Sequence, residues 1–305
     1  MRLVITGAGG WLARELALQA HKVGIKTLGI SSNPDVCKAA YDDVALPSSI
    51  EVSLFDPDDI LVHCAFSRKS IPQKLSVSLD YAKRVFLAAG HAHISGIVNV
   101  SSQSVYGSSS KDADENAPLC PDYPYALAKV ASEEILSGIM LAMGQDELCY
   151  TNVRLASLIG VANGKAPSNI LYKFIQKAIS DEPITIVGGD QKFSFLNVKD
   201  AARGLLELCT LNPLRWHHVY NLGTGCQTSI TEMAKLVQFV VLQRCGVHAA
   251  HIEIDEKADY QAIDVGMNCE LLYSSLQWKP LISFEETVEE TVEYCMKTSG
   301  CNVKG

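Results

Sequence analysis

Long hydrophobic runs and basic clusters are both missing from this sequence of 305 residues. No apolar span reaches the roughly 18 to 20 residues that a membrane helix needs. The N-terminal stretch MRLVITGAGGWLA is interrupted by glycines and lacks the long apolar region of a signal peptide. These absences predict a soluble, cytoplasmic protein without a membrane partner.

The charge and the cysteines exclude further classes. Lys and Arg number 26 against 34 Asp and Glu, a net charge of -8, which argues against nucleic acid as the main partner. The ten cysteines are scattered singly, with no C-x-x-C pair and no Cys/His cluster at zinc spacing. We therefore expect reduced thiols, mostly in the core, and no metal site.

Short apolar strands alternate with helical patterns in the first half of the chain. Strands are predicted at 2–6, 26–30, 60–65 and 96–102, and helices at 11–24 and 78–92. Such alternation predicts βαβ units and hence an α/β fold with a doubly wound parallel sheet, a Rossmann fold.

The alternation of predicted strands and helices is less regular after about residue 150. A strand is predicted at 149–160, then helices at 170–179, 198–209, 229–243 and 284–295, with strands at 183–188 and 218–223. We expect a dinucleotide-binding domain over 1–160 and a smaller, interwoven C-terminal substrate lobe over 161–305. Segments between about 183 and 222 are expected to return to the sheet.

A glycine turn lies directly between the first strand and the first helix. It reads Gly7-x-x-Gly10-x-x-Ala13, which provides a tight bend, close approach to a pyrophosphate and close helix packing. The helix N-terminus adds free N–H groups and a positive dipole. We therefore predict dinucleotide binding here, with Trp11 and Leu12 also in contact with the cofactor.

The end of the second strand carries no acidic residue for a ribose 2′-hydroxyl. Ser31 and Ser32 stand there instead, and no Arg lies beside them to bind a 2′-phosphate. Both are predicted to bind the cofactor, and the choice between NAD and NADP stays open.

Tyr125 and Lys129 lie four residues apart in YPYALAK and so share one face of a helix. Alone, this spacing is typical of an amphipathic helix whose Tyr packs and whose Lys extends into water.

The remaining motifs favour a catalytic interpretation. TGAGGWLA, HCAF, SSQSVYG, YALAK, VGGDQKFSFLNVKDAA, YNLGTG and QWKP resemble the extended short-chain dehydrogenase/reductase family, in particular its sugar-nucleotide epimerase/dehydratase branch, over nearly the whole chain. The resemblance implies that Tyr125 is the acid and base, that Lys129 holds the ribose and lowers the tyrosine pKa, and that Ser102 orients the substrate oxygen. It also places Cys64 and Ala65 at the cofactor.

The resemblance also narrows the reaction. The dehydratases of this family carry Asp-Glu after the serine, whereas this chain has Gln103 and Ser104, which cannot act as carboxylic acid or base. The 3,5-epimerising members need a histidine that ASLIGVANGKAPSN lacks. Redox at one carbinol or ketone remains, as in a 4-epimerase, a ketoreductase or an alcohol dehydrogenase.

The substrate site departs from the family pattern. Phe193-Ser194-Phe195 stands where the family reads Arg-Asp-Phe, and ADYQAIDVG lacks the second diphosphate-binding Arg. The substrate is thus a sugar nucleotide held differently or another sugar-like molecule. Ser102, Gln103, Ser104 and Asn169 are its predicted contacts, although Asn169 equally fits a helix N-cap.

Two further expectations concern function and assembly. The alternative to an enzyme is a dinucleotide-binding module that senses redox state or a partner without turnover, which the missing arginines motivate. By resemblance, the helix from Tyr125 to Met143 is expected to pair across a homodimer.

Overall fold

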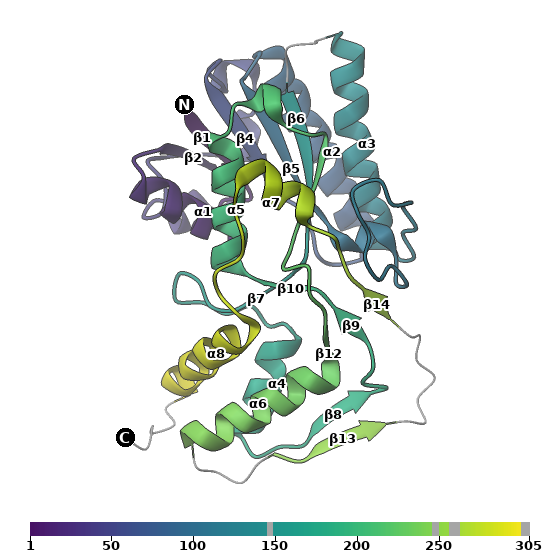
Figure 1. Ribbon diagram of the computed structural model, residues 1–305. Coiled ribbons are helices and arrows are strands. Elements are labelled where there is room, and N and C mark those ends of the chain that lie inside the picture. The colour runs from purple at the N-terminus through teal and green to yellow at the C-terminus, as the bar shows by residue number, and fades with distance from the viewer. Residues whose placement is uncertain (145–148, 246–249, 256–262, 300–305) are drawn as a thin grey trace.

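A parallel sheet of seven strands forms the upper half of the protein in Figure 1. The computed structural model describes residues 1–144, 149–245, 250–255 and 263–299. The strand order is β11-β6-β5-β4-β1-β2-β3. Their bounds are β1 (Arg2–Thr6), β2 (Lys26–Ile30), β3 (Asp43–Ala45), β4 (Asp59–His63), β5 (Gly96–Ser102), β6 (Cys149–Leu155) and β11 (Val219–Leu222). All neighbouring strands run parallel, so the predicted doubly wound fold is confirmed.

Helices cover both faces of this sheet, which is why most residues of its central strands are buried. On one face α1 (Trp11–Lys22) packs against α5 (Val198–Thr210), with α7 (Glu270–Leu276) beside β11. On the other face α2 (Pro72–His91) packs against α3 (Pro124–Met143). Alternate residues of β1 point to opposite faces of the sheet: Leu3 and Ile5 pack with α1, and Val4 packs with α2.

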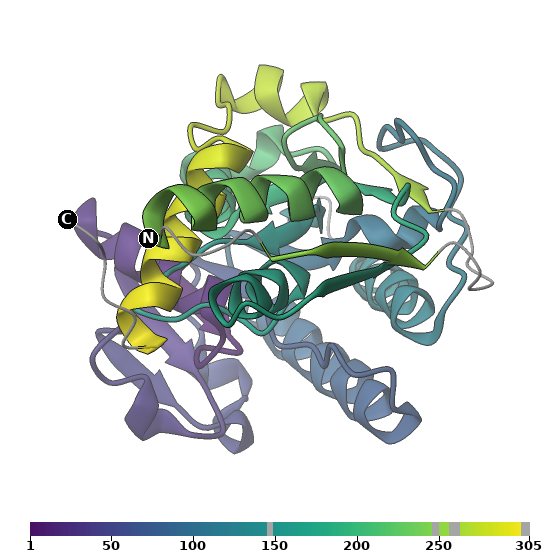
Figure 2. The same cartoon turned by 90° about the horizontal axis from the view of Figure 1, so that it is seen from below.

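A second core forms the lower lobe. It is built from α4 (Ile170–Ile179), α6 (Ile230–Cys245), α8 (Phe284–Ser299) and the paired strands β8 (Ile184–Val187) and β13 (Ile252–Asp255). Figure 2 shows this lobe from below, with α6 and α8 crossing and the two strands side by side. Within 183–222, β8 belongs to the lobe, α5 covers the sheet, and β11 forms the sheet's edge.

The chain passes between the sheet and the lobe through short strands. The single strand expected over 149–160 is wrong: the chain leaves the sheet at Ala156, so that β7 starts a separate pair with β10. The remaining elements are β7 (Ser157–Ile159), β9 (Lys192–Phe193), β10 (Phe195–Asn197), β12 (Thr228–Ser229), β14 (Asp264–Val265) and the 3-10 turns Pro34–Val36, Pro47–Ser49, Val52–Leu54, Gln103–Tyr106 and Pro213–Arg215.

Two of the expected absences can be compared with the described residues. None of the eight cysteines assigned there forms a disulfide, while Cys301 and the side chain of Cys245 lie outside the described part. Within the same ranges no helix combines the length and the apolar character needed to cross a bilayer. Part of ADYQAIDVG, residues 258–262, also lies outside them.

Candidate functional site

The glycine turn joins the end of β1 to the first turn of α1. Gly7 has a left-handed backbone (φ +66°), and a Cβ built on it would lie 2.9 Å from the Cα of Ala65. Gly10 caps α1, donates its N–H to the Gly7 carbonyl at 2.7 Å, and has no room for a side chain either. Ala13 is buried against the sheet. At each of these three positions, close packing explains why the sequence has a small residue, as the glycine pattern predicts.

Gly7→Ala is expected to cost about 1–3 kcal/mol of folding free energy, because it combines a left-handed backbone with a contact on Ala65. Gly24 is the matched control, since it also has a positive φ (+75°) but nothing within 4 Å of a built Cβ. Urea unfolding should show a smaller loss for Gly24→Ala, about 1–2 kcal/mol, and NAD affinity should fall only in the Gly7 variant. Equal losses at both sites would contradict the steric argument.

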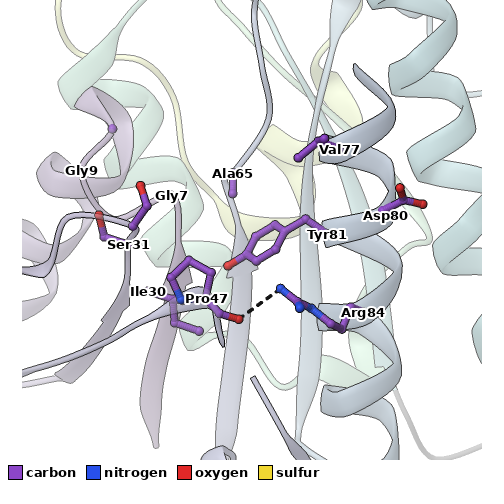
Figure 3. Close-up of a pocket in the computed structure, with 12 residues that line it drawn as sticks. Gly7, Gly9, Ile30, Ser31, Pro47, Ala65, Val77, Asp80, Tyr81 and Arg84 are labelled. Carbon is purple, nitrogen blue, oxygen red and sulfur yellow. Dashed lines mark hydrogen bonds between the residues drawn. The ribbon is translucent and has the colours of Figure 1, made fainter. Parts of the chain in front are cut away.

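A cavity of about 720 Å³ opens on one side of this turn (Figure 3). Tyr81 extends across it from α2 toward Pro47, and Arg84 from the same helix donates to the Pro47 carbonyl at 3.1 Å. Ser31 and Ser32 line the opposite wall, where the Ser31 hydroxyl is already engaged with the backbone of Asn33. The size and the position beside β2 suit an adenosine group.

A second cavity of about 440 Å³ continues from the other side of the turn. Gly7 and Gly10 line both cavities, so together they form one path past the N-terminus of α1. The remaining predicted cofactor contacts Trp11, Leu12, Ala13, Cys64, Lys129 and Tyr125 line this second cavity, together with Ser102, whereas Ala65 lines the first. The residues therefore fit an extended dinucleotide whose pyrophosphate crosses at the glycines.

Tyr125 and Lys129 meet at this second cavity as their helical spacing predicts. The Lys129 Nζ lies 6.0 Å from the centre of the Tyr125 ring and 4.1 Å from that of Phe66, and it donates to the Val100 carbonyl at 2.7 Å. Ser102 lines the same cavity as Tyr125. Lys129 is only 4% exposed, so the alternative of a lysine extending into water is wrong.

Burial dominates the protonation of both groups. Desolvation raises the pKa of Tyr125 to about 12, although the charge of Arg68 and the Ser102 hydrogen bond lower it. Desolvation lowers the pKa of Lys129 to about 7, partly opposed by Cys64 and Glu133. In the protein without cofactor the phenol is therefore neutral at pH 7, and Lys129 alone does not make it a base.

The three remaining predicted substrate contacts do not line this cavity. Gln103 is buried beneath Ser157, and Ser104 lies in the 3-10 turn after β5, where its amide N–H donates to Ser102. Asn169 caps α4 by accepting from the N–H of Tyr172 at 3.0 Å, which confirms the N-cap interpretation.

Several lining residues were not predicted. Arg68 lines the same cavity as Tyr125. It lies in HCAFSRK, just after the strand β4, and residues at the ends of parallel strands are where a ligand contact could have been predicted. On the adenosine side Val77, Tyr81 and Arg84 recur at i, i+4 and i+7. Tyr81 and Arg84 fall within the helix predicted over 78–92, and Val77 lies just before it. Ser157 had no comparable signal.

A buried ion pair connects α3, the helix that carries Tyr125 and Lys129, to β6. Glu133 on α3 and Arg154 on β6 are each 4% exposed and lie 2.8 Å apart. Glu133 also accepts from Ser101, and Arg154 donates to the Tyr106 hydroxyl at 2.9 Å. Although burial alone lowers the pKa of Arg154, the hydrogen bond and charge of Glu133 raise it above its usual value. This network fixes α3 against the strand end that carries Ser102.

Comparisons with known proteins find sequence relatives of this chain. dTDP-D-glucose 4,6-dehydratase is 27% identical over 214 residues in Mus musculus and 24% identical over 322 residues in Homo sapiens. These matches cover 69% and 96% of this chain, and 58% and 89% of the relatives. A putative UDP-glucose 4-epimerase of Methanocaldococcus jannaschii is 26% identical over 70% of this chain and 63% of its own. This chain thus spans less than two thirds of two of these relatives.

The fold has close parallels among solved structures. MoeE5 in complex with UDP-glucose and NAD superposes with a TM-score of 0.82 at 21% identity, covering 98% of this chain and all of that one. The model of the NAD dependent epimerase/dehydratase family matches residues 3–223, most of the chain. The predicted family and enzyme class are therefore confirmed. With its glycine turn, its Tyr-Lys helix and this match, the chain belongs to the NAD dependent epimerase/dehydratase family.

Proposed function

We propose that this protein is an NAD-dependent epimerase or oxidoreductase that acts at one carbinol or ketone of a sugar-nucleotide-like substrate. The observation that carries the proposal is the meeting of Tyr125, Lys129 and Ser102 around a cavity that continues from the glycine turn. A redox sensor would need the cavities that bind the dinucleotide, but it would not need the Tyr125 phenol and the Lys129 ammonium beside the nicotinamide end. The same observation therefore favours turnover over sensing.

The proposed roles follow from the positions of the side chains. NAD, when bound, supplies a hydride acceptor in its nicotinamide ring. Tyr125 takes the proton of the substrate hydroxyl, and Ser102 orients the same oxygen. Lys129 contributes positive charge from a buried position, and Arg68 offers a second cation toward the cofactor phosphates.

Dehydration is not part of the proposal. It would require a carboxylic acid after Ser102, and this chain has Gln103 and Ser104 there. The family's diphosphate-binding Arg is replaced by Phe193, and the next residue, Ser194, is buried and donates to the Cys226 carbonyl. We therefore propose a sugar nucleotide whose diphosphate is held by other groups.

The first experiment is to release and identify any dinucleotide that copurifies, and then to titrate the emptied protein with NADH and NADPH. Retained NAD together with interconversion of UDP-glucose and its 4-epimer would support an epimerase. An empty site that takes up NADPH reversibly would indicate a ketoreductase instead. Binding of neither dinucleotide would reject the proposed function.

Cofactor binding is expected to lower the pKa of Tyr125 from about 12 by about 1–3 units, because the oxidised nicotinamide places positive charge near the phenol. The phenolate absorbance that is lost in Tyr125→Phe should therefore develop at lower pH with NAD than without it. Oxidation should speed up with rising pH through that same pKa. An unchanged titration with NAD bound would argue against the acid/base role.

Assembly, location and domain division stay predictions. In support of a homodimer, α2 and α3 leave a groove lined by Leu87, Ile135, Ile139 and Met143. A cytoplasmic location and the boundary between residues 160 and 161 rest on the sequence.

A further inference from the structure

Ser157 brings another hydroxyl to the cavity where Tyr125 lies. It is the first residue of β7, just after the chain leaves the sheet, and its backbone N–H donates to the Ser194 carbonyl at 3.0 Å. Its side chain has one described partner, Gln103. Either the Gln103 carboxamide or the Ser157 hydroxyl could donate in this hydrogen bond, depending on how the carboxamide is oriented.

The position of Gln103 settles the direction of this hydrogen bond. The Gln103 amide nitrogen lies 3.0 Å from the Ser157 Oγ and 3.3 Å from the Ser194 carbonyl oxygen. Because a carbonyl only accepts, the group facing Ser194 must be the amide NH₂, which fixes the orientation of the carboxamide. Ser157 thus accepts from Gln103, and its own O–H has no acceptor within the described residues.

The position of Ser157 suits a hydrogen bond to a substrate oxygen other than the reacting one. Tyr125 and Ser102 line this cavity together and are the proposed contacts of the reacting oxygen. Ser102 pairs with Leu155 across β5 and β6, and Ser157 follows two residues later, after the chain has left the sheet. Its hydroxyl therefore reaches the cavity from beyond the end of β6, while Ser102 reaches it from β5. Two hydroxyls from different elements that line one cavity fit two different oxygens of one substrate.

We infer that Ser157 donates a hydrogen bond to a second substrate oxygen, on the carbon next to the reacting one, and that Gln103 is the positioning residue that aims it. The substrate class is then a vicinal diol or an α-hydroxy ketone within the sugar, rather than an isolated alcohol. This inference rests on the proposed function, because Tyr125 and Ser102 define the reacting oxygen.

The test compares UDP-glucose with UDP-3-deoxyglucose, which lacks the hydroxyl next to C4, on NAD-loaded protein. Turnover is followed by chromatography of the nucleotide sugars. The wild-type protein should prefer UDP-glucose by about three- to tenfold in kcat/KM, the effect of one neutral hydrogen bond. Ser157→Ala should lose this preference while still using the deoxy compound, and Ser157→Thr should keep it.

Gln103→Met tests the positioning role, because Met has similar length but no amide donor. In Gln103→Met the preference for UDP-glucose over UDP-3-deoxyglucose should fall toward the value expected for Ser157→Ala. Ser137→Ala is the matched control: this serine is on α3 and bonds Tyr150 at 2.9 Å. It should retain the full preference.

The outcomes separate this inference from the function on which it rests. A preference that survives in Ser157→Ala, or an equal loss on both compounds, would overturn it, since a merely structural serine affects both alike. If NAD binds but neither compound is used or bound, the second-oxygen contact is rejected while the cofactor assignment stands. Failure to bind NAD, by contrast, rejects the proposed function.

Discussion

Tyr125→Phe is expected to lower kcat about 100- to 10,000-fold, the usual contribution of a positioned acid or base. The phenyl ring keeps its contact with Phe66 (ring centres 6.1 Å apart), so the helix and the cavity should be preserved. NAD affinity is expected to change little, because Lys129 and the glycine turn remain. Steady-state kinetics on the NAD-loaded protein, with calorimetric titration of NAD, measure both quantities.

Tyr123→Phe provides the matched control for this substitution. Tyr123 stacks on Tyr125 with ring centres 6.2 Å apart and lines the same cavity, but it is 44% exposed. Its hydroxyl has no proposed role in proton transfer, so kcat should stay close to that of the wild type. Substantial activity in Tyr125→Phe would sink the proposed mechanism.

Glu133→Gln is expected to lower the free energy of unfolding by about 3–5 kcal/mol, because it leaves the Arg154 charge buried without its counter-ion. Ser101 also loses its carboxylate acceptor. Since Glu133 lies one turn beyond Lys129 on α3, the catalytic helix should loosen as well. Urea unfolding followed by circular dichroism gives the free energy.

Two comparisons test whether the charge itself is responsible. Adding Arg154→Met to Glu133→Gln removes the unpaired charge, so the double variant should lose less than the sum of the single losses. Asp35→Asn breaks the exposed pair with Lys38 and should leave the free energy of unfolding nearly unchanged. Strict additivity in the double variant would show that Glu133 and Arg154 act independently.

The repeating parts of the fold could be predicted from the sequence. RLVIT and GIVNVSS are apolar because helices cover both faces of their sheet, and the glycine turn follows from local steric needs at Gly7 and Gly10. Tyr125 and Lys129 could be placed together because a helix fixes the i, i+4 relation. Local geometry was enough for each of these features.

Features made by distant segments could not be predicted. The pairing of Glu133 with Arg154, and of Gln103 with Ser157, depends on how α3, β6 and β7 meet, which no periodicity encodes. Strands such as β9, β12 and β14 have two residues each, too few to show an alternating pattern. The pKa of Tyr125 is another case, because desolvation raises it where the resemblance alone suggested a lowered value.

The interleaving of the two cores has a consequence for biosynthesis. Six strands of the sheet are complete once β6 has left the ribosome, but β11, the edge strand beside β6, is made only after α4 and β8 of the lobe. The lobe core in turn waits for α8, near the end of the described chain. Domains generally fold as contiguous units while they emerge, starting from the N-terminus. Here the edge of β6 stays unpaired until β11 is made, and the lobe core stays incomplete until α8 is made, so both expose surfaces prone to aggregation during synthesis.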